Sequence, residues 1–201
     1  MTQKIVLASG NQGKIRELQQ SLGDCGYQII AQTELNITDI EETGLSFVEN
    51  AILKARNACL RSGLPAIADD SGLEVDALQG RPGIYSARFA GENANDATNN
   101  QQLLKQLEGL PASQRLARFQ CILVFMRHHE DPTPKIFQGS WQGRILTAPQ
   151  GDNGFGYDPL FFIPEHNCSS AQLTPETKNK ISHRGQAMQL LLKYFAITAS
   201  K

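Results

Sequence analysis

Carboxylate side chains follow a short apolar run, or precede a predicted helix, within the first 70 residues of the sequence. Asp69 and Asp70 follow the apolar run 66–68, so we predict that they lie at the end of a strand. Adjacent strand residues point to opposite faces, which lets one carboxylate face a site while the other holds the chain. Glu41 and Glu42 precede the helix that we predict over residues 46–61. A carboxylate pair drawn from these two places would suit Mg²⁺, although solvated surface acids are the common alternative.

A glycine-containing loop follows the first predicted strand and has the ingredients of an anion cradle. Its residues are Ser9, Gly10, Asn11, Gln12, Gly13 and Lys14. Glycines let backbone N–H groups turn inward, a helix N-terminus adds favourable partial charge, and Lys14 adds a mobile cation. The loop is not a Walker A motif, because only two residues separate its glycines and Ile15 stands where Ser or Thr would bind magnesium. A plain strand-to-helix turn fits the same spacing.

The strongest helix signal of the first half covers residues 46–61. Ser46 and Glu49 form a capping box, and Gly63 is well placed to end the helix. Asn50 and Lys54 are four residues apart, so they point the same way, one turn apart. Together with the glycine loop, this amide and this cation weaken the surface-acid alternative and favour a phosphate and metal site.

The second half contains a loop in which aromatic residues stand among glycines, and its sequence is Gly154, Phe155, Gly156, Tyr157, Asp158 and Pro159. Either ring could stack on a nucleobase, and Asp158 could accept from base N–H groups. The alternative is a loop whose aromatic rings pack inward. Lys178, His183 and Arg184 add positive charge near the end of the chain, where a solvated helix start is the common alternative.

Strands are predicted at residues 4–8, 27–31, 117–127 and 136–145, the last two as a hairpin pair. The 117–127 segment is almost continuously apolar, which is typical of a strand covered on both faces. Helices are predicted from Lys14, from a capping Asp96 to near Gly109, from Pro175, and after Ser182. This mixture predicts an α/β fold, formed by the 201 residues as a single domain.

Composition excludes several classes of protein. Hydrophobic residues make up 40% and charged residues 19%, and the net charge is −1, so neither disorder nor the coating of a nucleic-acid polymer is favoured. No window approaches the ~20 apolar residues of a membrane span. The initial apolar stretch is too short for a signal peptide. The four cysteines form no C-x-x-C pair, which favours reduced thiols and a cytoplasmic location.

Six motifs occur in order: residues 7–14, 47–55, 68–73, 82–88, 154–159 and 182–185. Through them the chain resembles the inosine triphosphate pyrophosphatase family from about Lys4 to Phe195. The resemblance implies an elongated, two-lobed α/β fold with a long mixed β-sheet flanked by helices and a central cleft. It also implies a homodimer, a Mg²⁺ cofactor, and hydrolysis of dITP, ITP and XTP to the nucleoside monophosphate and pyrophosphate.

The resemblance also implies roles for individual residues. Asp70 would be the general base and a Mg²⁺ ligand, with Glu41 as the second acidic ligand and Glu42 left open beside it. The triphosphate would be held by the loop residues Ser9, Gly10, Asn11, Gln12, Gly13 and Lys14 and by Lys54, with Ser71 beside the substrate. The nucleoside would be held by Phe155, Gly156, Tyr157, Asp158, Lys178, His183 and Arg184.

Chemistry supports this assignment and leaves two alternatives. Inosine and xanthosine carry a 6-keto oxygen where adenine carries an amino group, so donors near His183 and Arg184 would favour the keto bases by ~10⁴ or more. A pyrophosphatase for other modified nucleotides would use the same phosphate site. A nucleotide sensor without turnover is the alternative outside enzymes, and the presence of Asp70 and Lys14 argues against it.

Overall fold

The structure is a computed structural model, and it describes residues 3–11, 13, 15, 18, 19, 22 and 26–199, the last without its side chain. Gln12, Lys14 and Cys25 lie outside the described residues. The chain divides into two compact units. Unit 1 holds Met1–Asp70, Cys121–Gln138 and Gln186–Lys201, and unit 2 holds Ser71–Gln120 and Gly139–Gly185. The folding of the whole chain as one domain stays a prediction.

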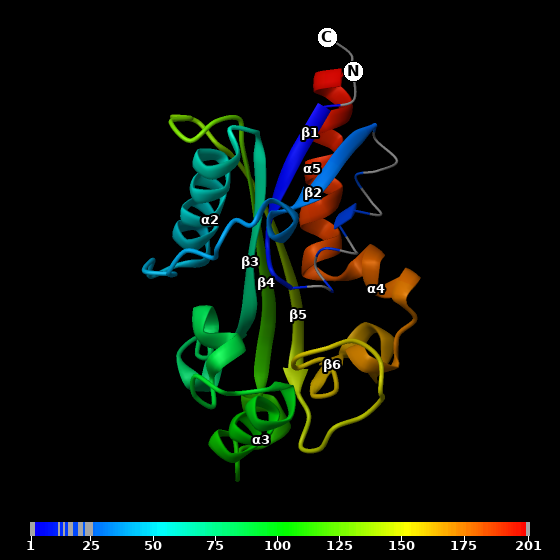
Figure 1. The fold of residues 1–201 in the computed structure, drawn as a ribbon. Helices are drawn as coiled ribbons and strands as arrows, with labels where there is room; N and C mark the ends of the chain where they lie inside the picture. The colour runs from blue at the N-terminus through cyan, green and yellow to red at the C-terminus, as the bar shows by residue number, and fades with distance from the viewer. Residues whose placement is uncertain are drawn as a thin grey trace. The chain divides into compact units, whose positions relative to one another are not determined.

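A seven-stranded mixed sheet is the main element of the fold (Figure 1). Its order is β2-β1-β3-β4-β5-β6-β7, so the sheet is open, with β2 and β7 at its edges. The strands are β1 Gln3–Ala8, β2 Tyr27–Ala31, β3 Ala66–Val75, β4 Leu116–Met126, β5 Lys135–Ile145, β6 Phe161–Ile163 and β7 Cys168–Ser169. β1 runs parallel to β2 and β3, whereas β6 is antiparallel to β5 and β7. This confirms the predicted α/β class and mixed sheet.

Four α-helices and six 3₁₀ turns have defined ends in the described part of the chain. The helices are α2 Phe47–Ser62, α3 Asp96–Gln106, α4 Pro175–Ile181 and α5 His183–Ala199. The 3₁₀ turns are Gln32–Leu35, Asp76–Leu78, Gly83–Arg88, Ala112–Gln114, Pro164–His166 and Ser170–Gln172. Ile15, Leu18 and Leu22 are helical and buried, as their spacing predicts. No helix in this part of the chain is long and apolar enough to span a bilayer.

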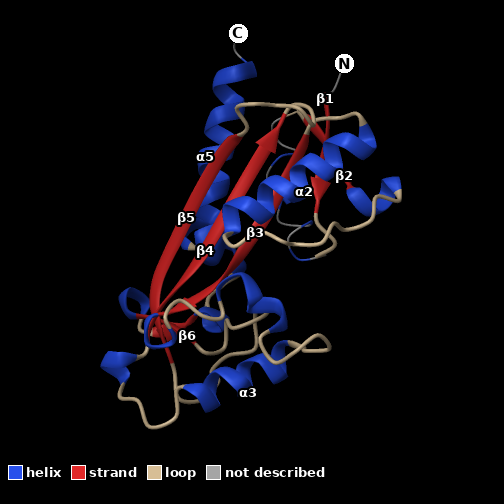
Figure 2. Ribbon diagram, turned by 90° about the vertical axis from the view of Figure 1, so that its left-hand side faces the viewer, coloured by secondary structure: helices blue, strands red, loops and turns tan. Residues whose placement is uncertain are grey.

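Unit 1 has helices on both faces of its part of the sheet (Figure 2). Alternation along β1 separates the two faces: Ile5 and Leu7 pack in a core with α5, whereas Val6 and Ala8 pack in another core with α2. The contacting residues of α2 are mostly small, which lets the helix approach the strands closely; they are Ala51, Ala55, Ala58 and Cys59. This packing fixes α2 against β3.

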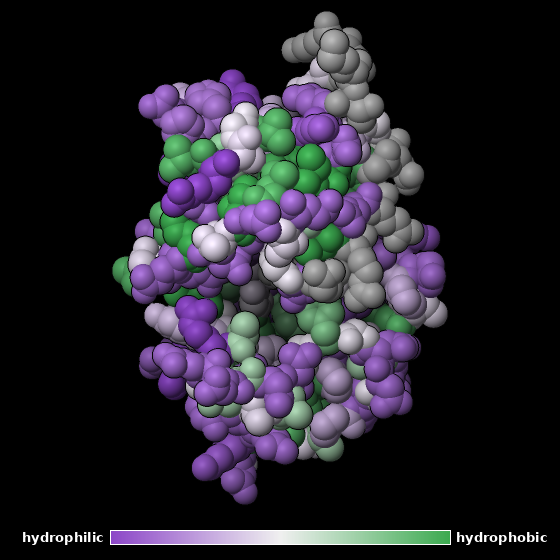
Figure 3. Space-filling model, in the orientation of Figure 1, coloured by the Kyte–Doolittle hydropathy of each residue, from purple (hydrophilic) through white to green (hydrophobic). Residues whose placement is uncertain are grey.

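Unit 2 has its own hydrophobic core. Its fully buried members include Leu73 of β3, Leu103 of α3 and Phe161 of β6. Trp141 and Tyr157 pack in the same cluster. Hydrophilic residues predominate on the face drawn in Figure 3, as expected when the large apolar side chains are gathered in such cores.

Two sequence predictions about element ends are wrong. Asp69 and Asp70 lie inside β3 rather than at the end of a strand, because the chain stays extended through Ser71 to bury Leu73 in the unit 2 core. In α3 the capping residue is Asn95, whose side chain accepts from the backbone N–H of Thr98, and the helix ends at Gln106 rather than near Gly109.

Candidate active site

A lysine between two carboxylates is the main feature of the site in unit 1. Lys54 of α2 donates from Nζ to Asp70 Oδ1 at 2.6 Å and to Glu42 Oε1 at 2.9 Å. The Lys54 side chain is 16% exposed and that of Asp70 is 10% exposed. Burial alone would lower the pKa of Lys54, but its attraction to Asp70 and then Glu42 outweighs burial and raises it. The ammonium therefore stays charged between the two acids.

β3 places its two aspartates on opposite faces, as the sequence predicts. Asp70 faces α2 and Lys54. Asp69 is buried on the other face, where its Oδ2 accepts from the Cys121 thiol at a donor–acceptor distance of 3.4 Å. Alternation along a strand therefore gives the Asp70 carboxylate to the site and keeps the Asp69 carboxylate in the interior.

Asn50 fixes the chain that follows Glu41 and Glu42. The sequence predicts only that Asn50 lies on the same side of its helix as Lys54, and it does not predict this role. Its side chain is fully buried, and Oδ1 accepts from the Gly44 N–H at 2.8 Å. A Cβ on Gly44 would lie 2.6 Å from that oxygen, so the contact needs glycine. This bond fixes the chain just after Glu42, which contacts Lys54, whereas Glu41 is exposed.

The described residues of the glycine loop are turned by their own side chains. Ser9 is buried, and its hydroxyl accepts from the Asn11 N–H at 3.2 Å. Asn11 Oδ1 accepts in turn from the Gly13 N–H at 2.9 Å. Gly10 has room for a Cβ, with the nearest atom, Asp39 Oδ2, at 3.6 Å. The cradle role of this loop stays a prediction, and its residues Gln12 and Lys14 lie outside the described ones.

Unit 2 presents one aromatic ring and buries the other in the loop 154–159. Phe155 is 39% exposed, with Lys178 Nζ 5.0 Å and Arg184 Cζ 5.7 Å from its ring centroid. Tyr157 is buried, and its hydroxyl donates to the Ser86 carbonyl at 2.8 Å. The sequence alternatives for this loop therefore divide between two residues: Phe155 is available for stacking, and Tyr157 packs inward.

Asp158 organises this loop from below. Its Oδ2 accepts from the Phe155 N–H at 2.8 Å and from Lys178 Nζ at 2.6 Å, and its Oδ1 accepts from the Ser170 hydroxyl at 2.8 Å. Gly154 has φ +83°, and a Cβ there would lie 2.1 Å from Asp158 Oδ2, so only glycine fits. Asp158 thus sets the places of both Phe155 and Lys178.

The start of α5 brings two further predicted residues to unit 2. Arg184 donates from Nη2 to the Ser71 hydroxyl at 3.0 Å. The His183 ring stacks on Phe119 at a centroid distance of 4.8 Å. Gly185 permits this placement, because a Cβ there would lie 2.0 Å from the backbone carbonyl oxygen of Asn179 in α4. The spacing of residues 182–185 predicts this helix start.

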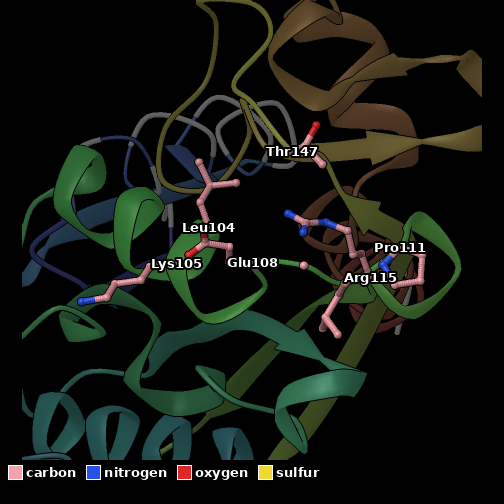
Figure 4. A pocket seen from close by; sticks show the side chains of 8 residues that line it. Leu104, Lys105, Glu108, Pro111, Arg115 and Thr147 are labelled. Carbon is pink, nitrogen blue, oxygen red and sulfur yellow. The ribbon is translucent and has the colours of Figure 1, made fainter.

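A cavity of about 630 Å³ lies elsewhere in unit 2, near the end of α3 (Figure 4). It is lined by Leu104, Lys105, Glu108, Gly109, Leu110, Pro111, Arg115 and Thr147. The buried guanidinium of Arg115 donates to the carbonyls of Leu107, Ile145 and Leu146 at 2.7–2.8 Å. Arg115 therefore ties the end of α3 to the end of β5, and no lining residue belongs to the predicted site.

The structure thus forms two groups of predicted residues, one in each unit. In unit 1 it brings Lys54 to Asp70, together with Glu42. In unit 2 it brings Ser71 to Arg184, and Phe155 to Lys178 and Arg184. The open mixed sheet makes this an α/β protein. The charged group of unit 1 suits a metal or phosphate ligand, and the exposed ring of unit 2 suits an aromatic one.

Comparison with known proteins gives the family. The chain belongs to the Ham1 family, whose sequence profile matches residues 5–194. It is 60% identical over 188 residues to the dITP/XTP pyrophosphatase of Vibrio vulnificus strain YJ016, covering 94% of each chain.

Solved structures agree. A HAM1 protein from Coxiella burnetii has a TM-score of 0.92 and 49% identity, with 97% of this chain and 99% of that chain covered. The Staphylococcus aureus Ham1 protein has a TM-score of 0.88 and 43% identity, covering 99% of this chain and 100% of that chain.

Proposed function

We propose that this protein is a hydrolase that converts the non-standard purine nucleoside triphosphates dITP, ITP and XTP to the nucleoside monophosphate and pyrophosphate. The observation that carries the proposal is the 60% identity, over 94% of both chains, to a relative named dITP/XTP pyrophosphatase. The activity removes deaminated purines from the nucleotide pool before they enter DNA and RNA.

Asp70 is the general base in this proposal. Its carboxylate orients a water molecule, takes a proton from it, and the water oxygen then bonds to the α-phosphorus as the bond to the pyrophosphate leaving group breaks. Lys54 supports this role because its ammonium lies 2.6 Å from Asp70 Oδ1 and favours the ionised carboxylate. Ser71 follows Asp70 along β3 and lies beside the substrate.

A divalent metal suits the residues of unit 1. Two carboxylate oxygens, from Asp70 and Glu42, converge on one cation, the Lys54 ammonium, at 2.6 and 2.9 Å. Such a donor set matches Mg²⁺, which binds one or two carboxylates and completes its shell with water and substrate phosphates. Asp70 would hold the ion with Glu41, or with the better-placed Glu42. When bound, Mg²⁺ would offset phosphate charge and polarise the bond to be cleaved.

The triphosphate is assigned to the glycine loop and the lysines of unit 1. Main-chain N–H groups around Gly10 and Gly13 and the cations Lys14 and Lys54 offset its charge. Ser9, Asn11 and Gln12 complete the loop. The local hydrogen bonds of Ser9 and Asn11 support this role, because they turn the backbone before a ligand arrives.

The nucleoside is assigned to unit 2. The exposed Phe155 ring stacks on the base, while Gly156 and Tyr157 give the loop its shape. Lys178, His183 and Arg184 supply hydrogen-bond donors toward the 6-keto oxygen, for which adenine has no matching acceptor. Asp158 acts by holding Lys178 and the Phe155 backbone.

Assembly and location complete the proposal. The family resemblance supports a homodimer, which light scattering after gel filtration would report as twice the 22.1 kDa of one chain. The described cysteines Cys59, Cys121 and Cys168 form no disulfide, which supports a reducing, cytoplasmic location.

The test is product analysis with a panel of nucleotides. Incubation of ITP with Mg²⁺ should release IMP and pyrophosphate, and dITP, ITP and XTP should react far faster than dUTP, GTP or ATP. Release of IDP and orthophosphate would contradict the bond assignment. A preference for dUTP would indicate the modified-pyrimidine alternative. Binding of ITP without any product would indicate a sensor.

A further inference from the structure

Helix α3 holds both backbone polar groups of Gly156. Asp96 Oδ2 accepts from the Gly156 N–H at 2.6 Å, and Asn100 Nδ2 donates to the Gly156 carbonyl at 2.8 Å. Asp96 and Asn100 are four residues apart in the helix, so they lie on one side, one turn apart. We call this pair the Asp96–Asn100 clamp. It binds Gly156 of the loop 154–159, which lies 60 residues after Asp96 and 56 residues after Asn100 in the sequence.

Side chains of α3 pair both backbone polar groups of Gly156, although Gly156 is only half-buried and water could reach it. Here the Asn100 amide is oriented toward Gly156 although its own Oδ1 is buried without a hydrogen-bond partner in the described part of the chain. Leaving a buried acceptor without a hydrogen bond is unfavourable. The Asn100 amide keeps this orientation because its Nδ2 then binds the Gly156 carbonyl, which fixes the position of the loop 154–159.

The helix that carries the clamp is itself fixed. Asn99, between the two clamp residues, is buried and donates from Nδ2 to the Ala87 carbonyl at 3.0 Å, while its Oδ1 accepts from the Ala90 N–H at 2.9 Å. Leu103, one turn further on, is fully buried in the unit 2 core. The clamp therefore transmits the position of a packed helix to Gly156.

Phe155 lies between two fixed points. Its own N–H is bound by Asp158, and the next residue, Gly156, is bound by the clamp. Tyr157 adds a third attachment through its hydroxyl to Ser86. The exposed Phe155 ring is thus the projecting part of a loop whose backbone is held on both sides.

We infer that Asp96 and Asn100 are positioning residues that fix the Phe155 ring for stacking on the base of the nucleotide. The inference rests on the proposed function for the identity of the ligand. Holding the ring in place before binding lowers the conformational entropy lost when the base arrives. The clamp then acts on affinity for the nucleotide and leaves the cleavage step to the residues of unit 1.

Steady-state kinetics with ITP separate positioning from a purely structural role. Asn100→Ala and Asp96→Ala should each raise KM about tenfold, because each removes one hydrogen bond, in one case to a charged group. kcat should stay within about twofold, the pattern of lost uniform binding. Asp96→Asn keeps an acceptor oxygen and should restore KM. The matched control is Gln101→Ala, at an exposed neighbouring position of α3.

Thermal unfolding and hydrogen exchange complete the test. Alanine favours helix, so all variants should fold. The Gly156 amide should exchange faster in Asp96→Ala than in the wild type or Gln101→Ala, without any nucleotide present. A lower Tm with unchanged KM, or unchanged exchange at Gly156, would overturn the inference. If the wild type exchanges as expected but does not cleave ITP, the proposed function fails and the stacking role with it, while the clamp itself stands.

Discussion

Two lysine–aspartate pairs, one in each unit, have the same geometry and different surroundings. Lys54 and Asp70 in unit 1, and Lys178 and Asp158 in unit 2, are each 2.6 Å apart. The second partner of Lys54 is another acid, Glu42. The further partners of Asp158 are neutral donors, a backbone N–H and a hydroxyl. Lys54 therefore bridges two acids, whereas Asp158 joins one cation to neutral donors.

The difference shows how one kind of ion pair can serve two purposes. Two carboxylates on one lysine offer the oxygen ligands that a divalent cation prefers, so the Lys54 pair suits the proposed metal-dependent step. The Asp158 side chain is 3% exposed and accepts from three protein donors, so the Lys178 pair suits a rigid support beneath Phe155. The distance between the charged atoms alone does not distinguish these purposes.

The largest expected effect is the loss of turnover in Asp70→Asn. An amide cannot take the proton of the attacking water, so kcat should fall by about 10³-fold or more while the protein still folds. Asp69→Asn, on the opposite face of β3, is the matched control and should keep most of the activity. Similar kinetics in the two variants would show that Asp70 is not the general base, and the Lys54–Asp70 pair would then have no catalytic purpose to set against the supporting one of the Lys178–Asp158 pair.

The next effect is on stability, and it belongs to unit 2. Asp158→Ala leaves Lys178 without its counter-charge and releases Phe155, so the free energy of unfolding should fall by about 3–5 kcal/mol. Urea denaturation monitored by circular dichroism measures this change. A loss below about 1 kcal/mol, typical of an exposed pair, would show that the Asp158 pair is not a structural support.

Replacing each lysine by methionine sharpens the comparison through metal dependence. Lys54→Met leaves Asp70 and Glu42 facing each other, so Mg²⁺ alone should raise its Tm by about 2–4 °C more than it raises that of the wild type. Lys178→Met should show no such gain. An equal rise in Tm with Mg²⁺ in the two variants would show that Asp70 and Glu42 do not bind the metal.

The smallest expected effect is a pH dependence of the Lys54 pair. The pKa of Lys54 is raised above its ordinary value of 10.5, so the folded state holds this proton more tightly than the unfolded state. The stabilisation is therefore complete below pH 10.5 and disappears as the pH rises through the folded pKa. The Tm difference between wild type and Lys54→Met should be constant from about pH 7 to 9 and shrink above it. A difference that grows with pH would contradict the assignment.

Local signals account for what the sequence predicts well. Ser46, Glu49 and Gly63 define both ends of α2 through bonds that each involve only nearby residues. The position of Lys54 on that helix follows from the same spacing. The helix start at Ser182, which brings His183 and Arg184 to unit 2, is equally local.

Long-range contacts account for what the sequence does not predict. The sequence predicts extended chain again at residues 73–75, but the unbroken passage of β3 through Ser71 and Gly72 depends on burial of Leu73 in the unit 2 core, which overrides the turn tendency of this pair. The choice between Glu41 and Glu42 falls in a segment without helix or strand periodicity. Asp96 binds Gly156 60 residues away, so no spacing rule could have found it.

The three hydrogen bonds that the Asp158 carboxylate already accepts have a consequence for discrimination between nucleobases. Three of the roughly four lone-pair positions of its carboxylate are occupied by protein donors. An exocyclic amine approaching Phe155 would find this acid already engaged, with the cations Lys178 and Arg184 as its other neighbours. Under the proposed function, Asp158 would therefore be a poor acceptor for an amino group of the base, and this would disfavour amino-bearing purines without any steric obstacle.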